Sequence, residues 1–234
     1  NQTLFLSARQ NFDALAAAYV ARGFRELKLR IGDDIDDDLA HLSHLRATYG
    51  TTIELAADAN GAWAPEAAAA RLAALAEFKL GYIEQPIAAG DWEALTRLAQ
   101  SSPMPVMLDE SLATMDDVRE LIARRDAAAG RFQGHLKLIK LGGVTPVFAA
   151  ARQLASAGVP FMIGQMNEGA VATASAVHMA VATRPIHAEL YCAGGLVNHP
   201  AVGLTYADGY VASRDAPGLG VVFRAPCAPI FSGD

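Results

Sequence analysis

The fold is decided by the stretch Ile53-Glu-Leu-Ala-Ala-Asp-Ala-Asn60 and two later stretches of the same design, Tyr82-Ile-Glu-Gln-Pro86 and Val106-Met-Leu-Asp109. Each is a short apolar run that ends in a carboxylate. Gly81 and Pro105, just before the second and third runs, are typical of the joints between elements. Apolar runs of this length between such joints predict buried β-strands.

The same design extends over most of the chain. Short apolar runs predict strands at Thr3–Leu6, Leu27–Ile31, Ile53–Ala57, Tyr82–Ile83, Val106–Leu108, Leu136–Ile139, Phe161–Ile163 and Ala188–Tyr191. Longer amphipathic or Ala-rich stretches predict helices at Phe12–Arg22, Asp36–Tyr49, Pro65–Phe78, Trp92–Ala99, Met115–Ala123, Pro146–Ala157 and Ala170–Thr183. Strict alternation predicts parallel βαβ units, and so many units of roughly 25 to 30 residues favour a closed α/β barrel. An open doubly wound sheet would show a Gly-rich phosphate turn after its first strand, and the sequence has none there.

The composition changes beyond Tyr191, where Gly and Pro become frequent. We assign residues 1–195 to the barrel and residues 196–234 to a C-terminal tail. The chain begins with Asn1 instead of Met and enters a strand almost at once. We therefore expect that an N-terminal part of the natural protein is missing from this chain.

The bulk numbers exclude some classes of function. The 234 residues are 52% hydrophobic and carry a net charge of −6, with no Lys/Arg stripe, so nucleic acid is not an expected partner. No apolar run reaches membrane-spanning length, and no basic segment precedes an apolar one as in a secretion signal. Cys192 and Cys227 have no metal-type spacing and are interpreted as free thiols of a cytoplasmic protein. The acidic run Asp33–Asp38 is interpreted as a solvated loop and helix N-terminus, not as a metal site.

The carboxylates at the strand ends are the main functional signal. Asp58, Glu84 and Asp109 are separated by 26 and 25 positions, one βα unit each. Strand ends of a barrel meet at one mouth, where three unpaired carboxylates would repel one another unless a cation bound them. Hard carboxylate oxygens suit Mg²⁺. A single acid could be a loop or helix-cap residue, but three at this spacing favour a metal site.

Two lysines accompany these acids. Lys28 and Lys137 lie within the apolar strands two and six, where burying an unpaired Lys is costly. We therefore favour a functional role for both over their interpretation as surface lysines. Beside a bound cation, a buried Lys has a lowered pKa and can act as a base. The metal would stabilise negative charge on a substrate carboxylate as an α-proton leaves.

Five ordered motifs resemble those of the enolase superfamily, and most closely its muconate-lactonizing-enzyme subgroup within the mandelate racemase/muconate lactonizing enzyme family. They are Lys28-Leu-Arg-Ile-Gly32, Asp58-Ala-Asn-Gly-Ala-Trp63, Tyr82-Ile-Glu-Gln-Pro86, Leu108-Asp-Glu-Ser111 and Lys137-Leu-Ile-Lys-Leu-Gly-Gly143. The resemblance runs from about Thr3 to Phe223. It implies a modified TIM barrel, (β/α)7β, whose tail packs on a separate, mostly N-terminal capping domain.

The same resemblance implies a chemistry. Asp58, Glu84 and Asp109 become the ligands of Mg²⁺, with Mn²⁺ as an alternative, and Lys137 becomes the acid/base on one face of a small carboxylate substrate. Barrels of this kind often associate, so a homo-oligomer is expected. Asn60, Glu110, Glu168 and Glu189 are candidates for substrate contact or for supporting the site. For Glu189 a salt-bridge role at the barrel end, and for Glu168 a helix-cap role, remain open alternatives.

One departure bears on the reaction. The subgroup usually carries Lys-x-Lys on strand two, with the second Lys catalytic, and this chain has Arg30 there. Arg stays protonated, so it is a poor base but a good clamp for a carboxylate. We therefore rank cycloisomerase or syn-elimination chemistry through an enediolate above the alternative of an N-acylamino acid racemase or epimerase.

Two further alternatives remain. Arg30 also motivates a non-catalytic member that binds metal and carboxylate without turnover. A phosphate-binding barrel enzyme of another kind would use Ala193-Gly194-Gly195, but it would not explain the three carboxylates.

Overall fold

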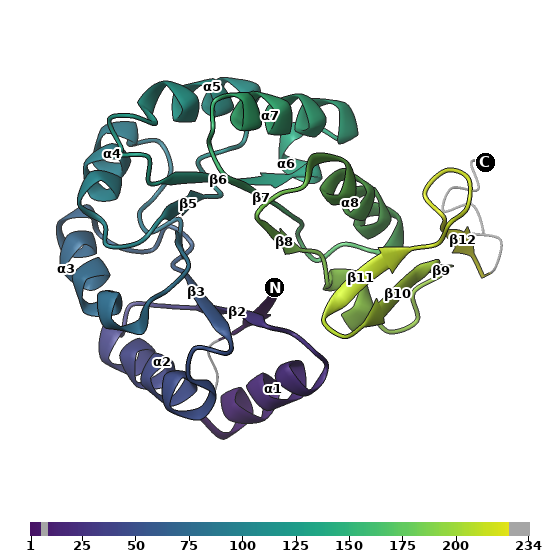
Figure 1. Cartoon of the computed structure of the whole chain (residues 1–234), viewed down its shortest axis with the longest axis horizontal. Coiled ribbons are helices and arrows are strands. Elements are labelled where there is room, and N and C mark those ends of the chain that lie inside the picture. Colours follow the sequence, from purple (N-terminus) through teal and green to yellow (C-terminus); the bar gives the residue numbers. More distant parts are fainter. Residues whose placement is uncertain (6–8, 225–234) are drawn as a thin grey trace, which may run out of the picture.

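The computed structural model describes residues 1–5 and 9–224, which form a ring of strands inside a ring of helices (Figure 1). Within these residues eight parallel strands pair strictly in sequence order. Their bounds are β1 (Gln2–Leu4), β2 (Glu26–Arg30), β3 (Glu54–Asp58), β4 (Ile83–Glu84), β5 (Val106–Leu108), β6 (Phe132–Lys137), β7 (Phe161–Gly164) and β8 (His187–Glu189).

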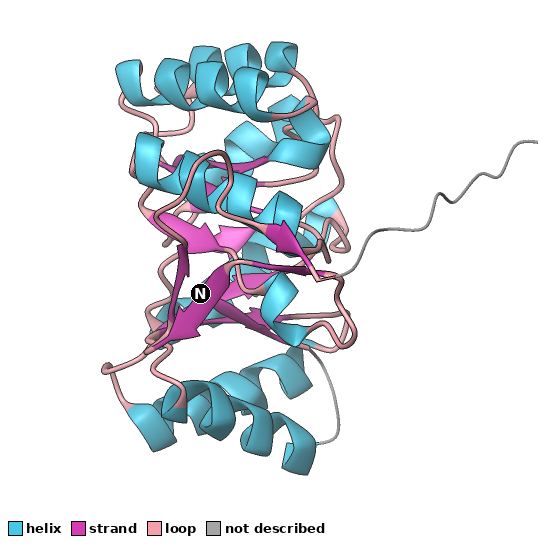
Figure 2. Ribbon diagram, turned by 90° about the vertical axis from the view of Figure 1, so that its right-hand side faces the viewer, coloured by secondary structure: helices cyan, strands magenta, loops and turns pink. Residues whose placement is uncertain are grey.

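Helices connect the strands and lie on both sides of them when the barrel is seen from the side (Figure 2). They are α1 (Arg9–Ala21), α2 (Ile35–Tyr49), α3 (Pro65–Leu75), the 3₁₀ turn η1 (Ala76–Phe78), α4 (Trp92–Ser101), α5 (Met115–Arg124), the four-residue α6 (Leu138–Leu141), α7 (Val144–Ser156) and α8 (Ala170–Thr183). One longer helix thus follows each of β1 to β7, which confirms the predicted (β/α)7β class. Among the described helices, none combines the length and apolar character needed to cross a membrane.

Individual hydrogen bonds connect β8 with β1 and so join the two ends of the ring. The backbone nitrogen of Asn1 donates to the Ala188 carbonyl at 2.6 Å, and the Thr3 hydroxyl donates to Glu189. The barrel is therefore nearly closed, so that residues from distant strands face one enclosed interior.

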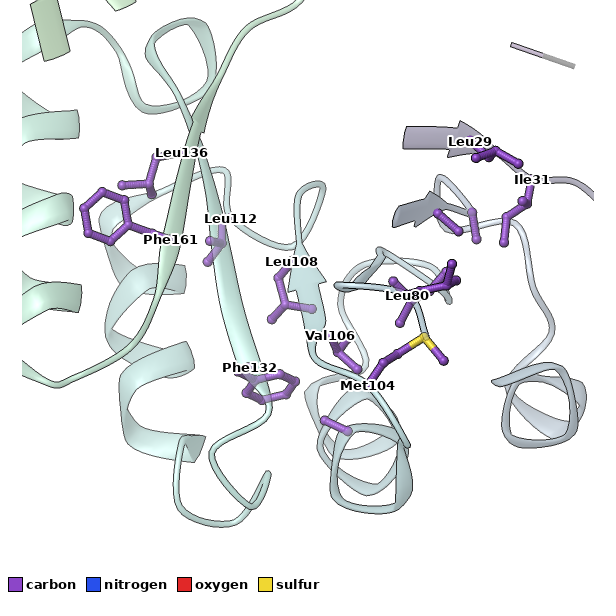
Figure 3. Close-up of a cluster of buried hydrophobic side chains, with 14 of the residues drawn as sticks. Leu29, Ile31, Leu80, Met104, Val106, Leu108, Leu112, Phe132, Leu136 and Phe161 are labelled. Atoms are coloured by element: carbon purple, nitrogen blue, oxygen red, sulfur yellow. The ribbon is translucent and has the colours of Figure 1, made fainter. Parts of the chain in front are cut away.

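The core has two parts because successive side chains of a strand point to opposite faces. The larger part lies between strands and helices and includes Leu29, Val106, Leu108, Leu136 and Phe161 (Figure 3). Burial of each such side chain contributes about 1.5–3 kcal/mol. The smaller part is a separate cluster of buried residues, Ala56, Tyr82, Met107 and Met162. The first three precede Asp58, Glu84 and Asp109 by two positions, so each carboxylate shares a strand face with an apolar residue below it.

Strand six differs from its prediction. It was expected at Leu136–Ile139, but β6 spans Phe132–Lys137, and Leu138 and Ile139 belong to α6. Gln133, His135 and Lys137 alternate with Phe132, Gly134 and Leu136 and are all buried, so this strand is polar on one face and did not show as an apolar run. Gly142 ends α6 with φ at +89°, a conformation that favours Gly.

The 3₁₀ turn η2 (Cys192–Gly195) follows β8 and precedes the tail, which contains the strands β9 (Ala201–Val202), β10 (Leu204–Ala207), β11 (Tyr210–Ser213) and β12 (Val222–Phe223). The β10–β11 hairpin packs closely on the turn between α1 and β2. A Cβ on Gly23 would lie 2.4 Å from the Asp208 carbonyl carbon, so that approach requires Gly. Part of the tail thus covers the barrel wall. Leu6, the end of the first predicted strand, and Cys227 lie outside the described residues.

The acidic run Asp33–Asp38 leads into the first turn of α2, and the prediction of a solvated helix N-terminus is right for most of it but wrong for Asp38. Asp34 is the N-cap and accepts hydrogen bonds from the backbone of Asp36 and Asp37. Asp38 is instead buried, where it accepts from the Gly32 backbone nitrogen at 3.1 Å. Burial, with a contribution from Asp37, raises the pKa of Asp38 to about 6.

We predict that Asp38→Asn stabilises the protein at neutral pH. An amide oxygen still accepts from Gly32, but no buried charge remains. Because the folded pKa of Asp38 lies above its unfolded value, wild-type stability is lost relative to the variant as the pH rises through the folded pKa. Urea unfolding should show a gap that widens between pH 4 and pH 7 to about 1–3 kcal/mol. Asp36→Asn, at an exposed position in the same helical turn, is the control. A gap that does not change with pH would contradict the prediction.

Candidate active site

A cavity of about 770 Å³ opens at the carboxyl ends of the strands. It is lined by eight of the ten site residues predicted from the sequence, namely Lys28, Arg30, Asp58, Asn60, Asp109, Glu110, Lys137 and Glu189. Glu84 is only 1% exposed and lies beside them without lining the cavity. Glu168 is half-buried outside the lining, and it accepts a hydrogen bond from the Met166 backbone nitrogen.

The three carboxylates predicted to meet do share common partners. Lys28 Nζ lies 2.8 Å from Glu84 Oε2 and 3.5 Å from Asp58 Oδ2. His135 Nδ1 lies 2.9 Å from Glu84 Oε1 and 3.7 Å from Asp109 Oδ1. Glu84 is thus central, between Asp58 on β3 and Asp109 directly after β5.

Burial and neighbouring charges shift these carboxylates in different directions. Burial and the repulsion of Glu84 raise the pKa of Asp58 to about 7. For Glu84, burial is outweighed by Lys28 and His135, so its pKa is lowered. For Asp109, burial is outweighed by His135 and by Lys140 and Lys137, and its pKa is lowered as well. The site therefore carries concentrated negative charge that nearby cations balance.

Lys28 lies at the centre of this charge. Its ammonium is buried and contacts Glu189 Oε2 at 2.7 Å as well as Glu84. Burial alone would lower the pKa of Lys28, but Glu189 and Glu84 raise it well above the usual value. Lys28 is therefore held as a counter-ion of Glu84 and Glu189, and the salt-bridge interpretation of Glu189 describes its contacts.

Arg30 faces the cavity from the end of β2. Its side chain is 29% exposed, and Nη1 lies 3.1 Å from Asp58 Oδ2. Lys137 lies on β6, four strands away in the ring of eight, which is the opposite side of the mouth. A permanent cation and a titratable amine thus flank the carboxylates.

Lys137 Nζ contacts Asp109 Oδ2 at 2.6 Å. Burial would lower the pKa of Lys137, but Asp109 and Glu84 raise it. This direction is opposite to the one expected beside a cation, because the nearest charge is a carboxylate. Lys140 binds the other oxygen of Asp109 and also the carbonyls of Asp109 and His135. The sequence prediction missed Lys140 because the residues before it, Leu136–Ile139, were interpreted as a strand, whereas a helical turn brings Lys140 back to Asp109.

Two more polar residues support the mouth. Gln85, fully buried with φ at +35°, accepts from the backbone nitrogens of Asp109 and Ser111 and donates to the Ser111 hydroxyl. It therefore joins the ends of β4 and β5. Asn60 donates a side-chain hydrogen bond to Glu110 at the rim.

His135 is a second residue that the sequence prediction missed. Among the described residues, Glu84, Asp109 and His135 form a group whose potential ligand atoms all lie within 4.8 Å of one another, and Asp58 is not in this group. The position of His135 in the sequence could have indicated a place in the site, because His135 precedes Lys137 by two residues and therefore lies on the same face of the strand. The carboxylates themselves suit a hard cation, since they are buried, clustered and mutually repulsive enough to raise the pKa of Asp58.

Comparison with known proteins identifies the family. Residues 11–226 match the family model described as Enolase C-terminal domain-like, and the chain belongs to this family. The structure is similar to that of a substrate-liganded complex of the L-Ala-D/L-Glu epimerase from Bacillus subtilis. The TM-score is 0.88 at 26% sequence identity, over 95% of this chain and 62% of that one.

Two relatives illustrate the range of activities in the family. A hydrophobic dipeptide epimerase of Enterococcus faecalis is 32% identical over 80% of this chain and 52% of its own length. Muconate cycloisomerase 1 of Pseudomonas putida is 30% identical over 86% of this chain and 53% of its own length. The chain thus spans about half of the length of these relatives.

We predict that Lys28→Met destabilises the protein by about 3 kcal/mol or more, because it leaves the buried carboxylate of Glu84 and the partly buried carboxylate of Glu189 without their cation. The double variant Lys28→Met/Glu189→Gln should recover part of the loss. Urea unfolding in the presence of a chelator measures both. Arg30→Met, which removes a partly exposed cation, is the control and should cost clearly less. Equal losses for the two single variants would show that Lys28 is not a counter-ion.

Proposed function

We propose that this chain is the barrel domain of a Mg²⁺-dependent isomerase or lyase that removes the proton α to the carboxylate of a small substrate. The observation that carries the proposal is the burial of Asp58, Glu84 and Asp109 around the shared partners Lys28 and His135. Lys137 lies on one side of the mouth and Arg30 on the other. Within this class we favour cycloisomerase or syn-elimination chemistry, which needs a base on one face only.

Asp58, Glu84 and Asp109 would hold Mg²⁺, or Mn²⁺ in its place. The bound cation would supply Lewis-acid stabilisation of the charge that develops on the substrate carboxylate. Three acidic ligands leave room for substrate oxygens, as an octahedral cation requires. Lys28 forms an ion pair with Glu84, and Lys140 forms one with Asp109, so these two lysines partly neutralise the negative charge of the carboxylates.

Lys137 is the proposed acid/base. Its amino group is buried at the mouth beside Asp109, where the free amine would take the α-proton and the resulting ammonium would give that proton back on the same face. Arg30 keeps its proton and would bind a substrate carboxylate from the opposite side. The intermediate would be an enediolate, which expels a leaving group with its bonding electron pair, either as a separate molecule or by opening a ring, while Lys137 gives that group the proton it has taken.

A racemase or epimerase is the second candidate, and the epimerases among the relatives favour it. It requires a base on each face. Lys28 is the available lysine on the Arg30 side, but Glu84 and Glu189 hold it at 2.8 Å and 2.7 Å. The geometry therefore supports the one-base reaction better.

We predict that Asp58→Asn, Glu84→Gln and Asp109→Asn each weaken Mg²⁺ binding at least tenfold, because each removes a charged oxygen ligand. Isothermal calorimetry on the folded variants measures this. Glu110→Gln, at the rim, is the matched control and should bind Mg²⁺ as the wild type does. Unchanged binding in the three variants would refute the metal site.

Proton exchange tests the reaction. In ²H₂O with Mg²⁺ and a panel of carboxylic acids, the wild type should exchange the α-proton of its substrate, and Lys137→Ala should lose this exchange. Arg30→Lys places a titratable amine on the second face and should add exchange of the opposite enantiomer. Undiminished exchange in Lys137→Ala would contradict the assignment. Binding of an acid without exchange in the wild type would favour the non-catalytic alternative.

A further inference from the structure

We propose that His135 is a positioning residue of the metal site, which orients the Glu84 carboxylate by a hydrogen bond from Nδ1 and does not itself bind the metal. This inference rests on the proposed function, because it takes Glu84 as a metal ligand. It adds a role for a strand-six residue that lies two positions before the proposed acid/base.

The two oxygens of Glu84 have separate donors. Oε2 is 2.8 Å from Lys28 Nζ, and Oε1 is 2.9 Å from His135 Nδ1. An ionised carboxylate can only accept, so Nδ1 carries the hydrogen of this bond. Donors from β2 and β6 on opposite sides of the ring fix the plane of a carboxylate on β4 between them. Such partners of ligating carboxylates set the ligand geometry that a metal meets.

The interior is shaped to admit the imidazole. His135 is fully buried, and the adjacent strand presents Gly164 to it. A Cβ at Gly164 would lie 1.9 Å from His135 Nε2, which no side chain could tolerate without moving the ring. The lack of a side chain at Gly164 therefore creates the space that His135 occupies.

The contacts of the ring distinguish it from a packing residue. Met107 and Met162 fill the interior below with apolar atoms, and a side chain of that kind would also fill the space of His135. Instead the imidazole lies against three carboxylates. In addition to its bond with Glu84, Nδ1 is 3.7 Å from Asp109 Oδ1, and Nε2 is 3.9 Å from Glu189 Oε2 without a hydrogen-bond partner in the described residues.

The test uses a matched pair of variants. In His135→Asn the amide nitrogen takes the place of Nδ1 on Cγ, so a donor to Glu84 remains. His135→Leu has the same branching at Cγ but no donor. Mn²⁺, titrated by electron paramagnetic resonance, is the probe. We expect the Mn²⁺ affinity to fall about 10- to 100-fold in His135→Leu and to stay near the wild-type value in His135→Asn. Equal affinities in the two variants would overturn the proposal.

Gly164→Ala provides a second route that keeps the imidazole. The added methyl group should displace the ring and weaken Mn²⁺ binding, and the double variant His135→Asn/Gly164→Ala should recover it, because Asn has no atom at the Nε2 position. Failure of this recovery in folded protein would contradict the proposal. Thermal unfolding of each variant verifies folding. If His135→Leu does not fold, the comparison of Gly164→Ala with His135→Asn/Gly164→Ala decides whether His135 positions Glu84.

Two further measurements separate the outcomes. Electron spin echo modulation of wild-type Mn²⁺ protein should lack directly coordinated ¹⁴N, and its presence would make His135 a ligand and overturn the positioning role. Glu84→Gln is the control for the proposed function. If it leaves Mn²⁺ affinity unchanged, the metal site itself is wrong. If it weakens binding while His135→Leu does not, only the role of His135 is wrong.

Discussion

The barrel depends on the balance of charge in its interior. Three buried carboxylates, Asp58, Glu84 and Asp109, and the partly buried Glu189 lie within reach of cations. The cations are the ammonium groups of Lys28, Lys137 and Lys140 and the guanidinium of Arg30. Any of these charges alone would cost several kcal/mol to bury. Their partners come from different strands, so the balance exists only when the ring is formed. Stability and the proposed chemistry therefore rest on the same ion pairs.

This interior is compatible with a stable fold because the strands separate the two environments. One strand face packs apolar side chains against the helices, and the other faces the interior, where polar groups lie above the cluster of Ala56, Tyr82, Met107 and Met162. The pairing of β1 to β8 in sequence order then brings the ends of β2 and β6 to opposite sides of one cavity. Arg30 and Lys137 thus face one cavity from two sides.

Most of the fold was predictable because apolar strands and amphipathic helices have periods that the sequence displays. The failures have a common cause. In β6 the inward face is polar throughout, so the strand was predicted too late in the chain, at Leu136–Ile139, and the helical turn α6 that carries Lys140 was not predicted. Asp38 was taken as solvated with its acidic neighbours, but the Gly32 backbone and burial give it a different environment. Both errors concern polar residues whose burial and hydrogen-bond partners are set by the folded structure and are not visible in the local sequence pattern.

The sequence by itself determined the order of the βα units and the carboxylates at three successive strand ends, because period and spacing are properties of the chain. Only the tertiary structure decided which groups neutralise one another. It holds Lys28 between Glu84 and Glu189, brings Lys140 to Asp109, and places His135 in the space left by Gly164. These relations depend on distances of a few ångströms between residues that are 29 to 161 positions apart in the chain, and electrostatic and hydrogen-bond energies fall steeply over such distances.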